Sequence, residues 1–186
     1  MTAPIEPTGA PDAPRAGARH VPIDEADDAA AAGAAIERFF QAFARRDAES
    51  MAACYHPMAS YSSPVFPDLR GELPGAMWAL ALSRVDSLAL DWSVAFCDAR
   101  KAQVAWRASW QRGRRAGRLE AVSTLALWDG RIVRQVDEFR FGRWAAHAIG
   151  PHGLLLGGLA PFRGLVRRRA RAALDAFAPA AGRGQA

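Results

Sequence analysis

One carboxylate in this 186-residue sequence stands where acid–base chemistry is favoured. From Ile132 to Phe141 the residue pattern predicts a strand, and residues two apart on a strand share a face. Asp137 then shares its face with one amide and three apolar side chains: Val133, Gln135, Phe139 and Phe141. Loss of hydration there raises the pKa of a carboxyl group, which suits a general base near neutral pH. The alternative is a structural ion pair with an arginine such as Arg107 or Arg134.

Two tyrosines and a histidine stand around the start of the first predicted strand. Tyr55 and His56 end the helix before it, and Tyr61 opens the strand itself. His56 could relay a proton and Tyr61 could polarise a carbonyl, although helix-end histidines more often have structural roles. The aromatic residues proposed to bind an apolar ligand are Tyr55, Trp78, Trp106 and Phe139. Tryptophans at these spacings are also typical of a core.

The sequence offers no pattern for a metal or a cofactor. Cys54 and Cys97 form no metal-type cluster with the four histidines, and His147 and His152 are separated by a Gly-Pro pair. His147 and His152 therefore do not form the helical i, i+4 pair that is typical of two metal ligands. Glycine-rich phosphate motifs and the GxSxG motif are also absent. We expect neither a metal nor a cofactor.

Helices are expected first and strands afterwards. Apolar spacing predicts a helix from Ala29 to Arg45, and Asp47 is typical of the N-cap of a short second helix that ends at Pro57. A strand over 60–66 and a helix over 72–84 follow. From Leu88 the period becomes two, which predicts β segments over 88–96, 103–111, 119–128 and 132–141.

This order predicts an α+β fold, with a curved antiparallel sheet wrapped over three N-terminal helices and a C-terminal helical extension. Asp129 and Gly130 form a strong hairpin signal between the last two strands. Strand parity places Ile132, Arg134, Val136, Glu138 and Arg140 together on a solvated outer face.

Composition divides the chain into three parts. Residues 1–26 are rich in Pro, Ala and Gly and are expected to form a disordered leader. Residues 27–142 form the domain, and 143–186 a basic helical extension. The sequence shows neither a signal peptide nor a run of 18 apolar residues, so a cytoplasmic protein is expected.

The extension carries the positive charge. Residues 140–186 hold eight arginines against one acidic residue. Nucleic-acid binding is not expected, because no exposed aromatic residues or reading module accompany this charge. An apolar stretch before a basic helix could place residues 153–171 on an anionic membrane. The favoured expectation is that the apolar residues Leu154–Leu156, Leu159 and Phe162 are buried against the domain, because their exposure would be unfavourable.

Four segments carry a family resemblance: FFQAFARRD over 39–47, CYHP over 54–57, PVFPDLRG over 64–71, and WDGRIVR over 128–134 running into Val136-Asp137. In this order they resemble the SnoaL-like branch of the nuclear transport factor 2-like superfamily, which includes polyketide cyclases and ketosteroid isomerases. The resemblance implies a cone-shaped fold with an apolar pocket, commonly as a homodimer. It also implies that Asp137 occupies a catalytic or ligand-contacting position.

Together these observations predict a protein that binds a small apolar molecule, with catalysis left open. As an enzyme it would be a cofactor-free isomerase or cyclase, in which Asp137 removes a proton next to a carbonyl and Tyr61 holds the enolate. Isomerisation, aldol closure and dehydration all fit this chemistry. The alternative is a non-catalytic module for dimerisation or partner binding, and a weaker one is peripheral membrane docking through residues 153–171.

Overall fold

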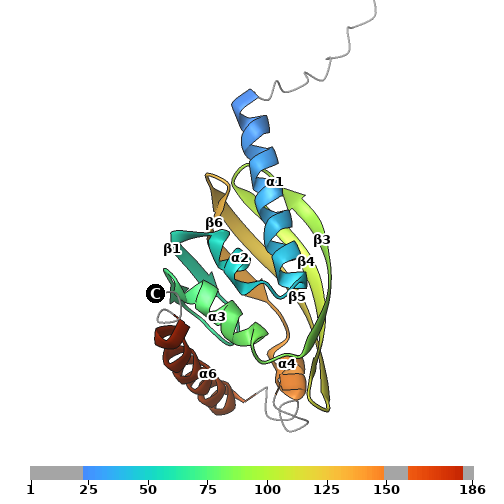
Figure 1. Cartoon of the computed structure of the whole chain (residues 1–186), viewed down its shortest axis with the longest axis vertical. Coiled ribbons are helices and arrows are strands. Elements are labelled where there is room, and N and C mark those ends of the chain that lie inside the picture. Colours follow the sequence, from blue (N-terminus) through green and yellow to red (C-terminus); the bar gives the residue numbers. More distant parts are fainter. Residues whose placement is uncertain (1–22, 149–158, 182–186) are drawn as a thin grey trace, which may run out of the picture.

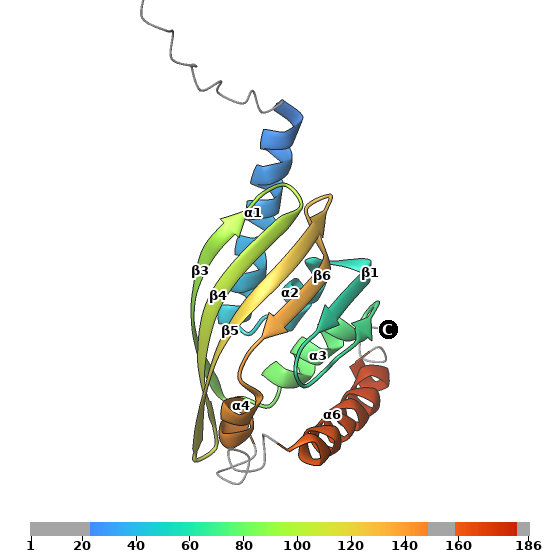
Figure 2. The ribbon, with the colours of Figure 1, turned by 180° about the vertical axis from the view of Figure 1, so that it is seen from behind.

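The protein is described by a computed structural model that covers residues 23–148 and 159–181. Three helices lie inside a curved six-stranded sheet, and among the described residues two further helices follow the last strand (Figures 1 and 2). The predicted α+β class is therefore confirmed. Most of the expected leader lies outside the described residues, but its last four residues already belong to the first helix.

The N-terminal helices differ from expectation at their ends. Helix α1 spans Ile23–Ala44 and α2 spans Ala48–Ala53. Asp47 caps α2 as predicted, because its side chain accepts a hydrogen bond of 3.0 Å from the backbone N–H of Ser50. The predicted continuation to Pro57 is wrong. Tyr55 already begins strand β1, Tyr55–Ser62, where it pairs with Ile132, so sheet pairing overrides the local helical pattern.

Helix α3 and the long strands follow. Strand β2 is the two-residue Leu69–Arg70, and α3 spans Leu73–Leu82 with proline in its first turn. The remaining strands are β3 (Ser87–Cys97), β4 (Lys101–Arg112), β5 (Arg115–Trp128) and β6 (Arg131–Glu138). The predicted hairpin between β5 and β6 is confirmed, since Asp129 and Gly130 both have positive φ, 49° and 62°.

The sheet order is β2-β1-β6-β5-β4-β3. All neighbouring strands are antiparallel except β1 and β6, which run parallel, with Tyr61 opposite Gln135. The expectation of a wholly antiparallel sheet is therefore corrected. A hairpin forces its two strands to be antiparallel, but β1 and β6 are joined by a long connection through α3 and β3–β5, which permits the parallel direction.

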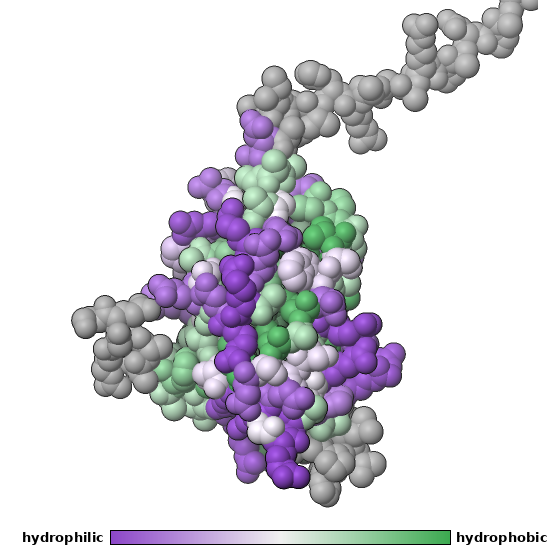
Figure 3. Space-filling view, turned by 45° about the vertical axis from the view of Figure 1, so that its right-hand side comes forward, coloured by the Kyte–Doolittle hydropathy of each residue, from purple (hydrophilic) through white to green (hydrophobic). Residues whose placement is uncertain are grey.

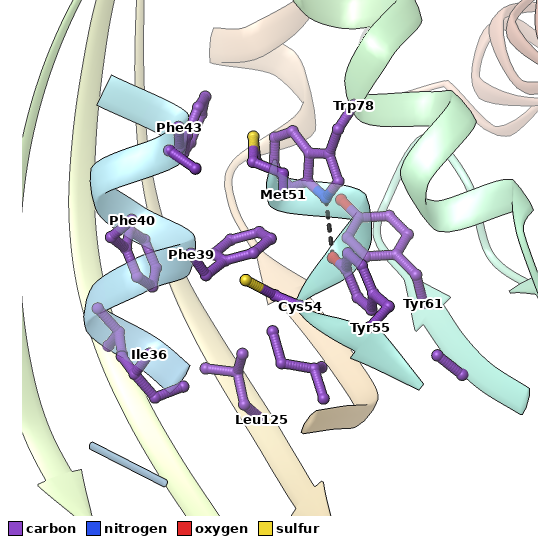
Figure 4. Packing of buried hydrophobic residues seen from close by; sticks show 14 of the residues in the cluster. Ile36, Phe39, Phe40, Phe43, Met51, Cys54, Tyr55, Tyr61, Trp78 and Leu125 are labelled. Carbon is purple, nitrogen blue, oxygen red and sulfur yellow. Dashed lines mark hydrogen bonds between the residues drawn. The ribbon is translucent and has the colours of Figure 1, made fainter. Parts of the chain in front are cut away.

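The core lies between the helices and the concave face of the sheet. Figure 4 shows Phe39 of α1 pointing toward Tyr55 of β1 and Trp78 of α3, with Phe40 on the other side of the helix. The Phe40 ring stacks on Trp92 of β3. The rings of Phe43 and Trp78 are 4.8 Å apart between centroids, and those of Phe39 and Tyr55 are 5.7 Å apart with edge-to-face geometry. Aromatic side chains thus fill the centre of the cone.

The C-terminal extension folds back onto the domain. Helix α4 spans Phe141–Ala148 and α6 spans Ala160–Ala181. Figures 1 and 2 show α6 beside α3, and Leu174 of α6 is completely buried in the core. Val65, Phe141, Ala145 and Val166 form a second buried cluster, which we call the C-terminal cluster.

The burial expected for the apolar stretch before α6 is met only in part. Phe162 is half-buried against the C-terminal cluster. Leu159 is 54% exposed, so its expected burial is wrong. It stands just before the first residue of α6, outside the helix face that packs on the domain. Leu154–Leu156 lie outside the described residues. In the described part of the chain, no helix is both long and apolar enough to cross a membrane.

Candidate functional site

Asp137 is buried on the concave face of β6 with 2% of its surface exposed. Three neutral groups donate hydrogen bonds to its carboxylate. The hydroxyl of Ser123 and the amide of Gln135 donate to Oδ1 over 2.6 and 2.8 Å, and the hydroxyl of Tyr61 donates to Oδ2 over 2.9 Å. Ser123 lies directly opposite Asp137 on β5, and Tyr61 comes from β1 on the other side. Because β6 lies between β1 and β5, donors from both neighbouring strands reach the Asp137 carboxylate.

A register shift explains which residues share this face. Strand β6 pairs Leu127 with Ile132 and Ala126 with Arg134, so Val133 is an extra residue in the ladder. Ile132 consequently points inward and is fully buried, on the same face as Gln135 and Asp137. Simple parity had placed Ile132 on the outer face, and the bulge corrects that prediction. Glu138 is exposed as expected.

Two chains of hydrogen bonds extend from the carboxylate into the core. The Oε1 atom of Gln135 accepts a 2.5 Å bond from the Tyr55 hydroxyl, whose oxygen accepts a 2.8 Å bond from Nε1 of Trp78 (Figure 4). On the other side, Nε1 of Trp106 donates to the Ser123 hydroxyl over 2.8 Å. Each amide and hydroxyl is thereby fixed in orientation, and Asp137 receives its bonds from pre-oriented donors.

Burial is the largest electrostatic influence on the carboxyl group of Asp137. Burial raises the pKa of Asp137 above its usual value, and the three hydrogen bonds oppose this shift only in part. Among the described residues, no arginine bonds to Asp137. Arg107 instead pairs with Glu120 over 3.1 Å, with both side chains about half exposed, and Arg134 is exposed. The ion pair considered from sequence is therefore not formed.

The two tyrosines remain hydrogen-bond donors at ordinary pH. Burial, and next the charge of Asp137, raise the pKa of both Tyr55 and Tyr61 well above the usual value for a phenol. Neither hydroxyl ionises under physiological conditions. Tyr61 can therefore supply a proton-bearing oxygen beside Asp137 throughout the working pH range of a typical protein.

The structure brings together five of the seven residues proposed from sequence: Asp137, Tyr61, Tyr55, Trp78 and Trp106. His56 lies apart from them. It is half-buried on β1, and its Nδ1 accepts a bond of 3.1 Å from the backbone N–H of Met58. Phe139 is half-buried beyond the end of β6, where its ring lies 6.3 Å from that of Trp144 in α4.

Two residues of the site, Gln135 and Ser123, were not among the sequence candidates. Gln135 carried a usable signal, because it is polar and two residues before Asp137 on the same apolar face. Ser123 carried none, since its place opposite Asp137 depends on the register of β5 and β6. Within the described residues, no group of three or more His, Cys, Asp or Glu side chains is placed to hold a metal ion.

Two clefts open on the described surface. The larger, about 1010 Å³, follows β3 to β6 beside α4, and its lining includes Trp106 and Phe139 along with Arg143 and His147. Asp137 is not among the described residues that line it. The smaller cleft, about 440 Å³, lies between α1, α2 and the β5–β6 turn. Glu138, the exposed neighbour of Asp137 on β6, also lines the larger cleft, so this cleft borders the sheet face opposite Asp137.

Comparisons with solved structures give the same fold. A candidate polyketide cyclase from Silicibacter sp. TM1040 is 21% identical with a TM-score of 0.56, and the match covers 63% of this chain and 95% of that one. A LEH-like epoxide hydrolase from M. tuberculosis is 18% identical with a TM-score of 0.53, over 73% and 97%. A candidate isomerase from Bacillus subtilis is 15% identical with a TM-score of 0.55, over 66% and 96%.

Identities this low establish the shared architecture, and nearly all of each relative corresponds to the central part of this chain. A search of curated proteins finds no match. The family model described as the SnoaL-like domain matches residues 36–135, which ends two residues before Asp137. That match spans more than half of the chain and agrees with the cone-shaped sheet, so the chain belongs to the SnoaL-like domain family.

Proposed function

We propose that this SnoaL-like protein binds a small apolar carbonyl compound and catalyses a cofactor-free isomerisation or cyclisation with Asp137 as general base. One observation carries the proposal: a fully buried carboxylate is held by three neutral donors and by no cation among the described residues. A carboxylate that needs no counter-ion but has a raised pKa is suited to accept a proton near neutral pH.

The arrangement also provides for the charge that forms. Oδ2 of Asp137 accepts one bond, from Tyr61, and a carboxylate oxygen has two acceptor positions. Proton transfer from carbon to Oδ2 breaks the C–H bond and moves its electron pair onto the carbonyl oxygen. The new O–H of Asp137 can then donate to the Tyr61 oxygen, which releases the Tyr61 hydroxyl to stabilise the enolate.

The remaining steps depend on the substrate. Return of the proton to another carbon gives isomerisation, and attack of the enolate on a second carbonyl gives ring closure. The names of two structural relatives, a candidate isomerase and a candidate polyketide cyclase, support this class of chemistry. Trp78, Trp106, Tyr55 and Phe139 would supply the apolar surface that receives the substrate.

A specific observation favours a second function. Every buried side-chain nitrogen or oxygen in the described part of the chain has a hydrogen-bond partner, and aromatic rings fill the cone. Such a satisfied interior also suits a non-catalytic module that binds partners through its surface. In that case the Asp137 network would serve only to fix the packing of β1, β5 and β6.

Hydrogen exchange at carbon separates the two functions. The protein is incubated in D2O with a panel of small cyclic ketones, and α-deuteration is followed by proton NMR. We expect exchange above the buffer rate, and a loss on the order of 10²-fold or more in Asp137→Asn. Asp28→Asn, which removes an exposed carboxylate on α1, is the matched control and retains activity. Equal exchange rates in the two variants would exclude Asp137 as the base.

A further inference from the structure

The smaller cleft has a chemical character quite different from that of the cone. Its floor and walls come from α1, the end of α2 and the turn between β5 and β6, which lie next to one another in Figure 1. Three arginines line it: Arg38 on α1, Arg45 directly after the end of α1, and Arg131 at the start of β6. Arg131 is six residues from Asp137, roughly 20 Å along the strand. The cleft is thus separate from the proposed catalytic site.

The positive charge in this cleft is not paired in salt bridges with described residues. None of the three arginines forms an ion pair with a described residue, and all three are exposed. One carboxylate, Asp129, also lines the cleft, so its ionised side chains sum to a charge of +2. Elsewhere in the described chain, Arg70, Arg107, Arg118 and Arg171 do pair with carboxylates.

Neutral groups that can hydrogen-bond complete the cleft. Gln41 lies on α1 between the two arginines, and Ser50 and Cys54 contribute from the α2 side. Burial raises the pKa of the Cys54 thiol, and the guanidinium group of Arg38 opposes that rise. The Arg38 side chain therefore lies close to Cys54. A volume of about 440 Å³ is within the range for small ligands.

The geometry points to a second binding site, in which Arg38, Arg45 and Arg131 hold a small anion carrying two or more negative charges as phosphate or carboxylate groups. Guanidinium groups bind such oxyanions by paired, charge-assisted hydrogen bonds. Three of them converging on one cleft, with a net charge of +2, match a dianion better than a monoanion. The ligand would bind independently of the apolar molecule proposed for the cone.

Thermal unfolding in the presence of inorganic pyrophosphate or citrate tests this site, with sodium chloride at equal ionic strength as the reference. At ten times the dissociation constant, a bound anion should raise the melting temperature by about 3 °C or more. Stabilisation by pyrophosphate alone would identify phosphate as the recognised group, and stabilisation by citrate alone would identify carboxylate. Either result supports the site, and neither anion exceeding chloride would overturn it.

Two double variants locate the binding. Arg38→Gln with Arg131→Gln removes two charges from the cleft, whereas Arg84→Gln with Arg112→Gln removes two exposed, unpaired arginines elsewhere. We expect at least about tenfold weaker pyrophosphate binding in the first double variant and near-normal binding in the second. Equal weakening in both would mean that overall charge, not the cleft, attracts the anion, and would overturn the proposal.

Cys54 supplies an independent readout, because it lines the same cleft and Cys97 does not. In a Cys97→Ala background, alkylation of Cys54 by iodoacetamide should be slower when pyrophosphate is bound. An unchanged alkylation rate at saturating pyrophosphate would contradict placement of the anion between Arg38 and Arg131.

Discussion

The burial of Asp137 without a positively charged partner is the central physical feature at the scale of single residues. An ionised carboxylate in an apolar interior is costly, and three neutral donors recover only part of its lost hydration. The buried Asp137 on the central strand β6 therefore lowers the free energy of unfolding when its carboxylate is ionised. Aspartate is therefore a poor choice for stability at this position, which is the reason to assign it a chemical task.

The first stability prediction concerns Asp137→Asn. The amide has nearly the same shape, can accept from Ser123 and Gln135, and can donate to Tyr61. We expect the free energy of unfolding at pH 7 to hold or to rise by about 1–2 kcal/mol in urea denaturation. A loss of about 3 kcal/mol or more would instead indicate a stranded buried cation, and would contradict the network described above.

The stability of the wild type and that of Asp137→Asn should depend differently on pH. Burial raises the pKa of Asp137 in the folded protein above its usual value, which applies to the unfolded chain. At a pH between these two pKa values, the folded protein therefore binds more protons than the unfolded chain. The contribution of Asp137 to stability is therefore fully present below its usual pKa and is lost as pH rises through the raised one. Between the usual and the raised pKa of Asp137, the free energy of unfolding of the wild type should fall relative to that of Asp137→Asn. Urea denaturation at successive pH values measures this difference.

How far the sequence predicts the site can be judged residue by residue. Alternation on β6 pointed to Asp137, and the aromatic residues of the predicted helices and strands included Tyr61, Tyr55, Trp78 and Trp106. His56 was assigned to the end of a helix, but it lies on β1 and bonds only locally. Ser123 was missed because its role depends on its pairing with Asp137 across β5 and β6. The sequence of a single strand does not determine which residue of the next strand lies opposite.

At the scale of elements, α6 shows how a strongly basic helix can still be part of a core. Its arginines face mainly outward, while Leu174 is fully buried and Val166 is 8% exposed. Arg167 also contacts the domain, because its Nε donates to the backbone carbonyl oxygen of Pro64 over 2.9 Å. The helix therefore packs by one narrow apolar stripe.

Truncation of that stripe should destabilise the domain. Leu174→Ala should lower the free energy of unfolding by about 2–5 kcal/mol, because it opens a cavity in the core. Leu165→Ala on the same helix, where the side chain is 38% exposed, should cost less than about 1 kcal/mol. Chemical denaturation of both variants measures the difference. Equal small losses would mean that α6 is not docked in solution.

The β4–β5 hairpin contains a second test of packing, in its paired strands. Gly117 lies against the ring of Trp110 on the neighbouring strand, and a Cβ atom added there would stand 2.3 Å from that ring. Gly117→Ala should therefore cost about 1–3 kcal/mol. Gly33→Ala in α1, where a Cβ meets nothing within 4 Å, should instead stabilise by up to about 1 kcal/mol. Thermal melts of the two alanine variants should move in opposite directions.

At the scale of the whole molecule, oligomeric state is an open prediction. The resemblance implies a homodimer, and the surface has apolar residues available, with Val94 47% and Phe96 51% exposed on the edge strand β3. Figure 3 shows apolar areas beside a hydrophilic band on the side of the molecule that β3 borders. Light scattering after gel filtration should give twice the 20.0 kDa of one chain. A mass of 20.0 kDa would contradict the homodimer.

The sequence predicted the overall architecture well, because the change of period near Leu88 separates helices from strands without any tertiary information. It could not predict the parallel pairing of β1 with β6, or the bulge at Val133. Both features arise from contacts between segments far apart in the chain. Local patterns reach only a few residues, so they predict which elements form and leave their mutual arrangement open.

The pairing of β1 with β6 also has a consequence for biosynthesis. Tyr61 leaves the ribosome 74 residues before its partner Gln135, a delay of about 4–15 s at ordinary translation rates. Throughout that interval β1 has only the two-residue β2 as a neighbour, and its other backbone edge is open to wrong partners. The nascent chain should therefore engage holding chaperones until β6 emerges, and the hydrogen-bond network around Asp137 is among the last parts of the protein to form.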